Sequence, residues 1–379
     1  LIAFGIKSAF PLLHNWVQDA YPEATVTGTV ILSAFTTKLA IYALARAFPG
    51  TDVLIPIGGA MIILPIVYVV LENDLRRVLA YSLNSQLGYM VIGVGIGTEL
   101  AINGTAAHVF VHIMYKSLLF MCMGAVLFRT GTVKVTELGG LYKSMPVTTV
   151  FCLIGAISIA AFPLTGGFVS KAMIQSAALT GGLDIIWPIM LFACAGILDH
   201  SGIKVPFFTF FSQDRGLRVK EAPVNMLIAM GIAAFFCIGI GVFPGLLFEL
   251  LPYAPTYNPY SFGHIISALQ LLLFAVLVFM LLIRYKVYPS ELRSTNLDFD
   301  WFYRVPLKRL IQAIGRLILI VWNWLLGIAN DIVYRFINTV TETHGDGKFM
   351  ARTMGSSTAV MIIVALLGFV LVFLYRFTQ

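Results

Sequence analysis

The stretch His108-Val-Phe-Val-His112-Ile-Met-Tyr-Lys116 decides how the rest of this chain is interpreted. It places two imidazoles and one ammonium group inside an apolar segment that runs from Ala101 to Phe128. Helical spacing of i, i+4 and i+8 puts the three side chains on one face, with about 6 Å of rise between neighbours. A charged group at the centre of a bilayer costs roughly 2.5–3.5 kcal/mol even on the lenient insertion scale. The row therefore predicts a proton relay at membrane depth. The alternative is a soluble core helix whose His and Lys reach its end.

The composition of the whole chain favours the membrane interpretation. Hydrophobic residues make up 59% of the 379 residues and charged residues only 11%, whereas ordinary globular domains carry about 25% charged residues. The apolar runs are continuous and lack a period of two, which excludes a transmembrane β-barrel. The predicted fold class is therefore an all-α polytopic membrane protein.

The net charge of +7 and the cysteines exclude several other classes of protein. The basic residues lie in short loops between apolar segments, so membrane topology explains them better than nucleic-acid binding does. No CxxC motif or Cys/His pair occurs, so we predict no disulfide framework, no metal site and no cofactor in this chain. The cysteines stand singly inside apolar segments, at Cys122, Cys152, Cys194 and Cys237.

The chain is long enough for about ten helical spans of roughly 20 residues each. The predicted spans are residues 1–17, 27–48, 53–71, 78–97, 101–128, 147–178, 184–211, 224–243, 262–284 and 357–375. The first should break at Pro11, and the sixth at Pro163 with the pair Gly166 and Gly167, because proline removes a backbone donor and glycines loosen a helix. Broken helices at membrane depth are tolerated only where the freed backbone is buried in protein or lines a wet cavity.

Basic residues alternate between loops and predict the orientation of the spans. One side carries Arg76, Arg77, Arg129, Lys134, Lys143, Arg215, Arg218 and Lys220, whereas the other offers Arg46 with Glu99 and Asp184. The positive-inside rule makes the first set cytoplasmic, so the C-terminus is predicted on the outer side. Asp19 and Glu23, in the first predicted loop, lie on the cytoplasmic side, but acidic residues weigh little in this rule.

The interval Leu297–His344 differs from the predicted spans because charged residues are interspersed with aliphatic and aromatic ones. Apolar residues recur there at helical spacing, at Leu307, Leu310, Ile311, Ile314, Leu317 and Ile318. This pattern predicts a long amphipathic helix along the cytoplasmic surface or against neighbouring subunits. The alternative is an eleventh span at Leu317–Ile328, which is apolar but short.

Three more lysines fall inside apolar segments, at Lys7, Lys38 and Lys171. A single such lysine could extend its ammonium group to the membrane interface, but four segments with a base each make that explanation strained. Burial disfavours the charged form of a lysine, so a buried lysine can take up and release a proton, and histidines can bridge the gaps. Asp199, His200 and Lys204 form a second-tier candidate group, which could equally be a structural ion pair.

Residue 1 is Leu, and the chain opens inside an apolar segment without a charged n-region or a cleavage site. It therefore lacks the pattern of a signal peptide. We expect the chain to be the later part of a larger protein, or one piece of a split one.

Four stretches, in this order along the chain, resemble one known family. They are Phe4–Trp16, Leu79–Tyr89 (LAYSLNSQLGY), His108–Phe120 (HVFVHIMYKSLLF) and Pro163–Lys171 (PLTGGFVSK). They resemble the antiporter-like subunits that respiratory complex I shares with the Mrp-type multisubunit Na⁺/H⁺ antiporters. The tracts Gly202–Phe208, Gly216–Leu227 and Tyr288–Arg304 are most similar to the D-type subunit of the Mrp antiporters.

The resemblance implies an organisation that corresponds to the family's seventh span through its last. The end of a first antiporter-like repeat falls on residues 1–50 and a second repeat on 51–211. Additional spans occupy 212–296, a lateral helix 297–345 and a final membrane helix 346–379.

The resemblance also implies roles for individual residues. Lys7 matches the lysine of the family's first broken helix, which in a full subunit pairs with a glutamate two spans upstream. Lys171 matches the lysine of the second broken helix, at the exit side. The central hydrophilic axis is matched by Lys38, His108, His112 and Lys116. The glutamate and the six preceding spans are absent from this sequence, so either another chain supplies the input half or the chain is only part of a subunit.

The function that these residues predict is proton translocation in a subunit of a multisubunit cation/proton antiporter, which makes the chain a transporter subunit rather than an enzyme. Its partners would be other integral membrane subunits, the lipid bilayer, H⁺ and either Na⁺ or K⁺, in a bacterial cytoplasmic (inner) membrane. The alternatives are a proton-pumping subunit of complex I, a subunit of a bicarbonate-accumulating complex, and a structural scaffold in which the lysines are dispensable.

Overall fold

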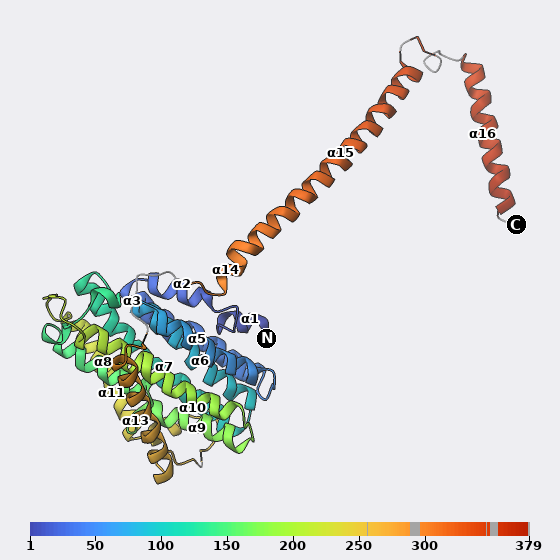
Figure 1. Cartoon of the computed structure of the whole chain (residues 1–379). Coiled ribbons are helices and arrows are strands. Elements are labelled where there is room, and N and C mark those ends of the chain that lie inside the picture. Colours follow the sequence, from blue (N-terminus) through green and yellow to red (C-terminus); the bar gives the residue numbers. More distant parts are fainter. Residues whose placement is uncertain (256, 289–295, 346, 349–354, 378–379) are drawn as a thin grey trace. The chain divides into compact units, whose positions relative to one another are not determined.

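The computed structural model describes residues 1–255, 257–288, 296–345, 347–348 and 355–377. Its internal contacts divide the chain into unit 1, Leu1–Asp300, and unit 2, Trp301–Gln379. Unit 1 is a bundle of packed helices (Figure 1). Within the described ranges the regular structure is helical, apart from one isolated β-bridge between Asp74 and Lys134. The predicted all-α fold is confirmed.

The helices of unit 1 follow the apolar segments of the sequence. They are α1 (Ile2–Lys7), α2 (Asn15–Glu23), α3 (Val26–Ile31), α4 (Thr37–Ala47), α5 (Leu54–Leu71), α6 (Leu75–Ile96), α7 (Glu99–Thr130), α8 (Pro146–Ile159), α9 (Gly166–Thr180), α10 (Ile186–Ile197), α11 (Val224–Val242), α12 (Gly245–Phe248) and α13 (Phe262–Arg284). Wider π-helical turns occur at η1 (Leu32–Thr36), η4 (Leu198–Lys204) and η5 (Phe207–Phe211). Across both units, eight helical stretches of described residues are long and apolar enough to cross a membrane.

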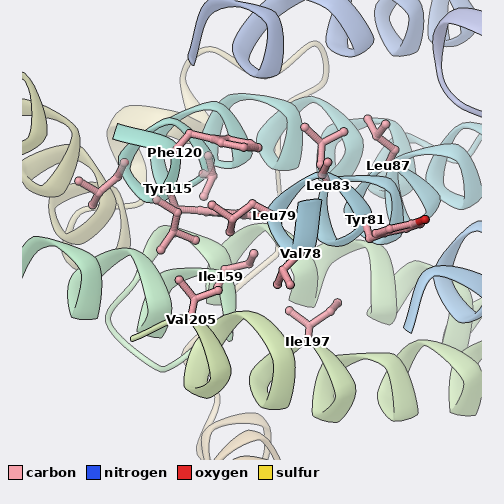
Figure 2. Packing of buried hydrophobic residues seen from close by; sticks show 14 of the residues in the cluster. Val78, Leu79, Tyr81, Leu83, Leu87, Tyr115, Phe120, Ile159, Ile197 and Val205 are labelled. Carbon is pink, nitrogen blue, oxygen red and sulfur yellow. The ribbon is translucent and has the colours of Figure 1, made fainter. Parts of the chain in front are cut away.

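Helix α6 lies at the centre of unit 1. All its residues except Arg77 and Ile96 are buried, because α2, α5, α7 and α9 pack around it. Figure 2 shows Val78, Leu79 and Leu83 of α6 among apolar side chains of neighbouring helices. Its sequence also places Asn84, Ser85 and Gln86 in this core, so the centre of the bundle is partly polar.

The close crossing of α5 and α6 depends on two facing glycines. A Cβ added at Gly88 would lie 2.7 Å from the backbone oxygen of Gly58, and one added at Gly58 would lie 2.8 Å from the oxygen of Gly88. Small residues allow membrane helices to approach each other in this way. Gly58 and Gly88 therefore set the distance between the two helices.

Both predicted helix breaks are present, and the same tetrapeptide forms them. Ala9-Phe10-Pro11-Leu12 separates α1 from α2, and Ala161-Phe162-Pro163-Leu164 separates α8 from α9. The φ angles agree, at 63° and 70° for the Ala and Leu of the first break and 60° and 71° for those of the second. Positive φ is strained for these residue types, so the surrounding packing must enforce it.

The expectation of a loop at Asp19 and Glu23 was wrong, because both residues lie within α2.

The segment Asn296–Asp300, called the anchor segment below, is held against the rest of unit 1. Asp298 is 7% exposed; its carboxylate accepts a hydrogen bond from the Tyr81 hydroxyl at 2.8 Å and lies 3.4 Å from His14 Nε2. Burial by itself raises the pKa of Asp298, but hydrogen bonds from His14, Phe299 N–H and Tyr81, with the charge of His14, bring it below its ordinary value. The carboxylate therefore remains charged and fastens the anchor segment.

Unit 2 consists of helices whose described side chains are exposed, apart from half-buried Val305 and Ala359. After α14 (Asp300–Phe302) and the π-helical turn η6 (Tyr303–Leu307) come α15 (Lys308–His344) and α16 (Ser356–Phe377). Most of the predicted lateral interval is thus one continuous helix of 37 residues. The stretch Asp300–His344 is also apolar enough to cross a membrane, so its surface orientation stays a prediction. Residues 289–295 of the tract Tyr288–Arg304, and residues 346, 349–354 and 378–379 of the predicted final segment, lie outside the described residues.

Candidate functional site

Helix α7 carries the central row of bases. The Thr98 side chain caps its first turn by accepting from Ala101 N–H at 3.3 Å, and Gly131 ends the helix in the left-handed region at φ 76°. Between these ends, His108, His112 and Lys116 are completely buried. The imidazole centroids of His108 and His112 are 6.0 Å apart, so the helical spacing places them in sequence along one face.

His108 is held by hydrogen bonds from two other helices. Its Nε2 lies 3.0 Å from Gln86 Oε1 of α6, and its Nδ1 lies 2.9 Å from Ser170 Oγ of α9. An amide oxygen only accepts, so Nε2 carries a hydrogen. Ser170 Oγ is also 3.2 Å from Gly166 O, so its hydroxyl can donate to a neutral imidazole, or accept from a protonated one and donate to Gly166 instead. The site therefore accommodates both protonation states of His108.

His112 and Lys116 have buried polar atoms with no hydrogen-bond partner among the described residues. The His112 ring lies between His108 and Tyr115, whose centroid is 5.1 Å away. Lys116 Nζ lies 5.9 Å from the centre of the Phe120 ring. Buried polar groups without a protein partner ordinarily bond to ordered water.

Lys38 reaches the same region from α4. Its Nζ donates to Ser33 O at 2.5 Å and lies 3.3 Å from Thr37 Oγ1. Ser33 is in the π-helical turn η1, where the widened ladder leaves carbonyl groups available to side chains. Both η1 and α4 pack against α7, and the charge of the buried Lys38 ammonium group acts electrostatically on the bases of the central row.

Lys171 lies on α9, after the second break, and is 1% exposed. Its Nζ donates to Ile159 O at 2.6 Å and lies 5.6 Å from the centre of the Tyr89 ring. The break provides this acceptor, because the last carbonyls of α8 have no partner within their own helix. Gly167 keeps the two halves close, since a Cβ there would collide with Ser158 O.

The structure brings together five of the six predicted relay residues. The charges of Lys38, Lys116 and Lys171 and the ring of His108 all act electrostatically on His112. Lys7 is different, because its side chain is exposed at the end of α1. The described residues do not bury Lys7, and its part in the relay stays a prediction.

The second-tier group lies on the π-helical turn η4, but its members have separate contacts. Lys204 Nζ donates to the carbonyls of Val69, Val70 and Glu72 at 3.1, 2.9 and 2.8 Å, which caps the C-terminal end of α5. His200 Nδ1 lies 2.9 Å from Ser201 Oγ, and the charges of Lys116 and Lys204 act on its ring. Asp199 Oδ1 is buried without a partner among the described residues. We therefore assign Lys204 a structural contact and keep His200 as a neighbour of the row.

Several partners of the bases were not singled out from the sequence. Gln86 accepts from Tyr115 OH at 3.1 Å as well as contacting His108, and Ser201 donates to Ser82 Oγ at 2.6 Å. A signal was available, because Ser82, Gln86 and Tyr89 lie at i, i+4 and i+7 on one face of the stretch Leu79–Tyr89. Among the described residues, no group of three or more His, Cys, Asp or Glu side chains gathers as metal ligands would.

Comparison with known proteins places this geometry in context. Residues 1–198 match the family described as NADH:quinone oxidoreductase/Mrp antiporter, TM. Over 259 residues the chain is 34% identical to the L subunit of the F(420)H(2) dehydrogenase of Methanosarcina mazei, which covers 63% of this chain and 38% of that protein. It is 33% identical over 225 residues to the D subunit of the Na(+)/H(+) antiporter of Alkalihalophilus pseudofirmus, covering 57% of this chain and 45% of that one. The chain thus spans less than half of the length of both relatives.

A solved structure shares the fold over almost the full chain. A chain in the structure of the membrane-bound sulfane sulfur reductase, an archaeal respiratory membrane complex, matches 97% of this chain and 67% of its own length. The TM-score is 0.62 at 24% sequence identity. A match of this extent supports the fold of both units, each taken by itself.

Proposed function

Because the chain belongs to the NADH:quinone oxidoreductase/Mrp antiporter transmembrane family, we propose that it is a proton-translocating part of an antiporter-like membrane subunit. The assembly that we favour is a multisubunit cation/proton antiporter of the Mrp type, with this chain in the place of the D-type subunit. The observation that carries the proposal is the buried row of Lys38, His108, His112, Lys116 and Lys171. None of the five forms an ion pair with a carboxylate among the described residues.

The proposed mechanism is electrostatic coupling between neighbouring bases. Two positive charges 6.0 Å apart, the separation of the His108 and His112 rings, repel by about 3 kcal/mol at an effective dielectric constant of about 20. A proton that arrives at one base therefore weakens the hold of the next base on its own proton. Protons would then pass along Lys38, His112, Lys116 and Lys171, with water connecting the sites near the break.

Replacing Lys116 or Lys171 with Ala tests the relay. We expect both variants to assemble into the complex and to lose proton transport in inverted membrane vesicles, since each removes a base from a single-file row. Lys143→Ala is the matched control, because Lys143 is 48% exposed and pairs with Asp214 in a loop. Normal transport by both Lys116→Ala and Lys171→Ala would contradict the relay and favour a scaffold.

A second candidate is a proton-pumping subunit of a redox-driven complex of the complex I type. The specific observation in its favour is the 34% identity to a subunit that is named as part of a dehydrogenase. In that case the redox groups would belong to other chains, and this chain would still be the transporter. Purification of the native complex separates the two candidates, because flavin and iron–sulfur absorbance would accompany only the redox-driven one.

The remaining parts of the proposal concern the assembly. We place the chain in a bacterial cytoplasmic membrane beside other integral membrane subunits, with α15 along the cytoplasmic surface and the C-terminus outside. The input half of the pathway would come from upstream spans or from a second chain. Mass spectrometry of every polypeptide in the native complex, including its N-terminus, decides between those two arrangements.

A further inference from the structure

A cavity of about 610 Å³ lies between α9, α10 and α13 and reaches Lys171. Polar side chains on its wall include Gln175 and Ser176 of α9, and Ser176 donates to Tyr257 OH at 3.1 Å. At about 30 Å³ for each water in the liquid, a space of this size has room for on the order of twenty waters. The positive-inside prediction places the N-terminus of α13 toward the outer side. With that orientation, the cavity would lie between the last base of the row and the outer half of the membrane.

His264, in the first turn of α13, is half-buried on the wall of this cavity. Its ring stacks on Phe168, with centroids 4.7 Å apart and an interplanar angle of 19°. Phe168 is three residues before Lys171 on α9, so the stack holds the imidazole next to the helix that carries the lysine.

The hydrogen bonds of His264 determine which nitrogen is basic. Nδ1 lies 2.9 Å from Pro259 O, and a carbonyl oxygen only accepts, so Nδ1 carries a hydrogen in every protonation state. Nε2 is therefore the ring atom that carries the lone pair in the neutral imidazole, and it has no hydrogen-bond partner among the described residues. The other ionisable groups near this imidazole are Lys171, Cys194 and Tyr257 on the cavity wall and Tyr260, which faces Phe168.

We propose that His264 is the proton shuttle between Lys171 and the outer aqueous phase. This inference rests on the proposed function, since it adds a further proton-exchanging residue to the same pathway. Imidazole is the side chain best suited to exchange protons near neutral pH. Among the described residues no carboxylate lines the cavity, so the imidazole is its natural proton acceptor. Protons would cross the cavity through water, bind Nε2 and leave from Nε2 to the outside.

The test is chemical rescue of transport by the intact complex in membrane vesicles. His264→Ala should lower proton flux by about tenfold or more, and free imidazole at millimolar concentration should restore much of it, because the cavity can admit the small base. The wild-type complex and the exposed-site variant His344→Ala, each with the same imidazole, set the baseline. Co-purification of the partner subunits checks that the complex has assembled.

His264→Asn separates proton exchange from a purely structural role. The Asn amide can still donate to Pro259 O, but it cannot take up a proton. We expect the same loss of flux as in His264→Ala. Wild-type proton flux in either variant would overturn the shuttle. So would wild-type flux in His264→Asn together with a failure of imidazole to rescue His264→Ala.

Lys171→Ala keeps the two proposals distinct. If it abolishes transport while the His264 variants transport normally, only this inference fails. If Lys171→Ala and Lys116→Ala both transport normally, the proposed function fails.

Discussion

At the scale of single residues, the bases depend on side chains that are themselves uncharged. Gln86 holds His108 by one hydrogen bond and Tyr115 by another, and both contacts are fully buried. The orientation of the His108 imidazole is therefore determined by α6 together with Ser170 of α9, although the histidine belongs to α7. An uncharged residue on one helix thus decides how a base on another presents its nitrogens to the pathway.

Replacing Gln86 with Leu should impair both stability and transport. The change keeps the size of the side chain but leaves His108 Nε2 and Tyr115 OH without partners, at about 1–3 kcal/mol for each unsatisfied group. The midpoint of thermal unfolding should fall and proton flux should decrease, as measured on the purified complex and in vesicles. Gln270→Leu is the control, because Gln270 is exposed on α13. A Gln86→Leu complex with unchanged stability and flux would refute the supporting role.

The bases themselves could be predicted from the sequence, whereas most of their partners could not. The exceptions are Ser82, Gln86 and Tyr89, which share one face of the stretch Leu79–Tyr89. A lysine or histidine in an apolar run is conspicuous because burial of a charge is costly, and five such residues are indeed buried here. Whether a base meets a carbonyl, an amide or open surface depends on how helices pack, which no local pattern records. Lys7 and Lys204 illustrate this point, because one is exposed and the other caps α5.

At the scale of elements, local sequence predicts where helices break, but it does not predict how helices contact one another. Proline made both breaks predictable, and the repeated tetrapeptide Ala-Phe-Pro-Leu at residues 9–12 and 161–164 was visible in the sequence as a sign that they share one backbone conformation. The π-helical turns η1 and η4 carry no such signal. They widen the helix beside Lys38 and at His200, and only packing reveals them.

Gly88→Ala should separate α5 from α6. The new Cβ would lie 2.6 Å from the Ile62 side chain and 2.7 Å from Gly58 O, and backbone cannot yield as a flexible side chain does. Overpacking of this kind costs about 1–3 kcal/mol. Gly239→Ala is the matched control, since a Cβ at this position in α11 meets no atom within 4 Å. We expect a lower unfolding midpoint for Gly88→Ala alone; equal midpoints for the two variants would show that the crossing tolerates a methyl group.

Asp298→Asn should loosen the anchor segment, with a defined dependence on pH. The pKa of Asp298 is lowered in the folded chain, so its charged form adds stability above the ordinary value of about 4. That contribution disappears as pH falls through the lowered folded pKa. Hydrogen exchange of the peptide that contains residues 296–308 should therefore be faster in the variant than in the wild type at pH 5–8, and this difference should shrink below about pH 4. A ratio that is constant across this range would show that the charge contributes nothing.

At the scale of the whole molecule, the orientation of unit 2 in the membrane follows from one choice about α15. If α15 lies along the cytoplasmic surface, α16 crosses the bilayer once and residue 377 is outside. If α15 spans the bilayer, the same end is cytoplasmic. A reporter that is active only on one side of the membrane, fused after Gln379, distinguishes the two. We expect the reporter to be active on the outer side. Activity on the cytoplasmic side would mean that α15 is an eleventh membrane span rather than a surface helix.

The central position of α6 has a consequence for how the protein enters the membrane during synthesis. This helix carries Arg76, Asn84 and Gln86, and it is not among the stretches apolar enough to cross a bilayer unaided. Its polar side chains would be unfavourable in lipid, whereas α5 and α7, its neighbours in sequence, pack against it and bury them. We therefore expect the insertion machinery to release α6 only together with α5, as a hairpin. If synthesis stopped after α5 and before α6, α5 would lie in lipid with the face that carries Gly58 uncovered.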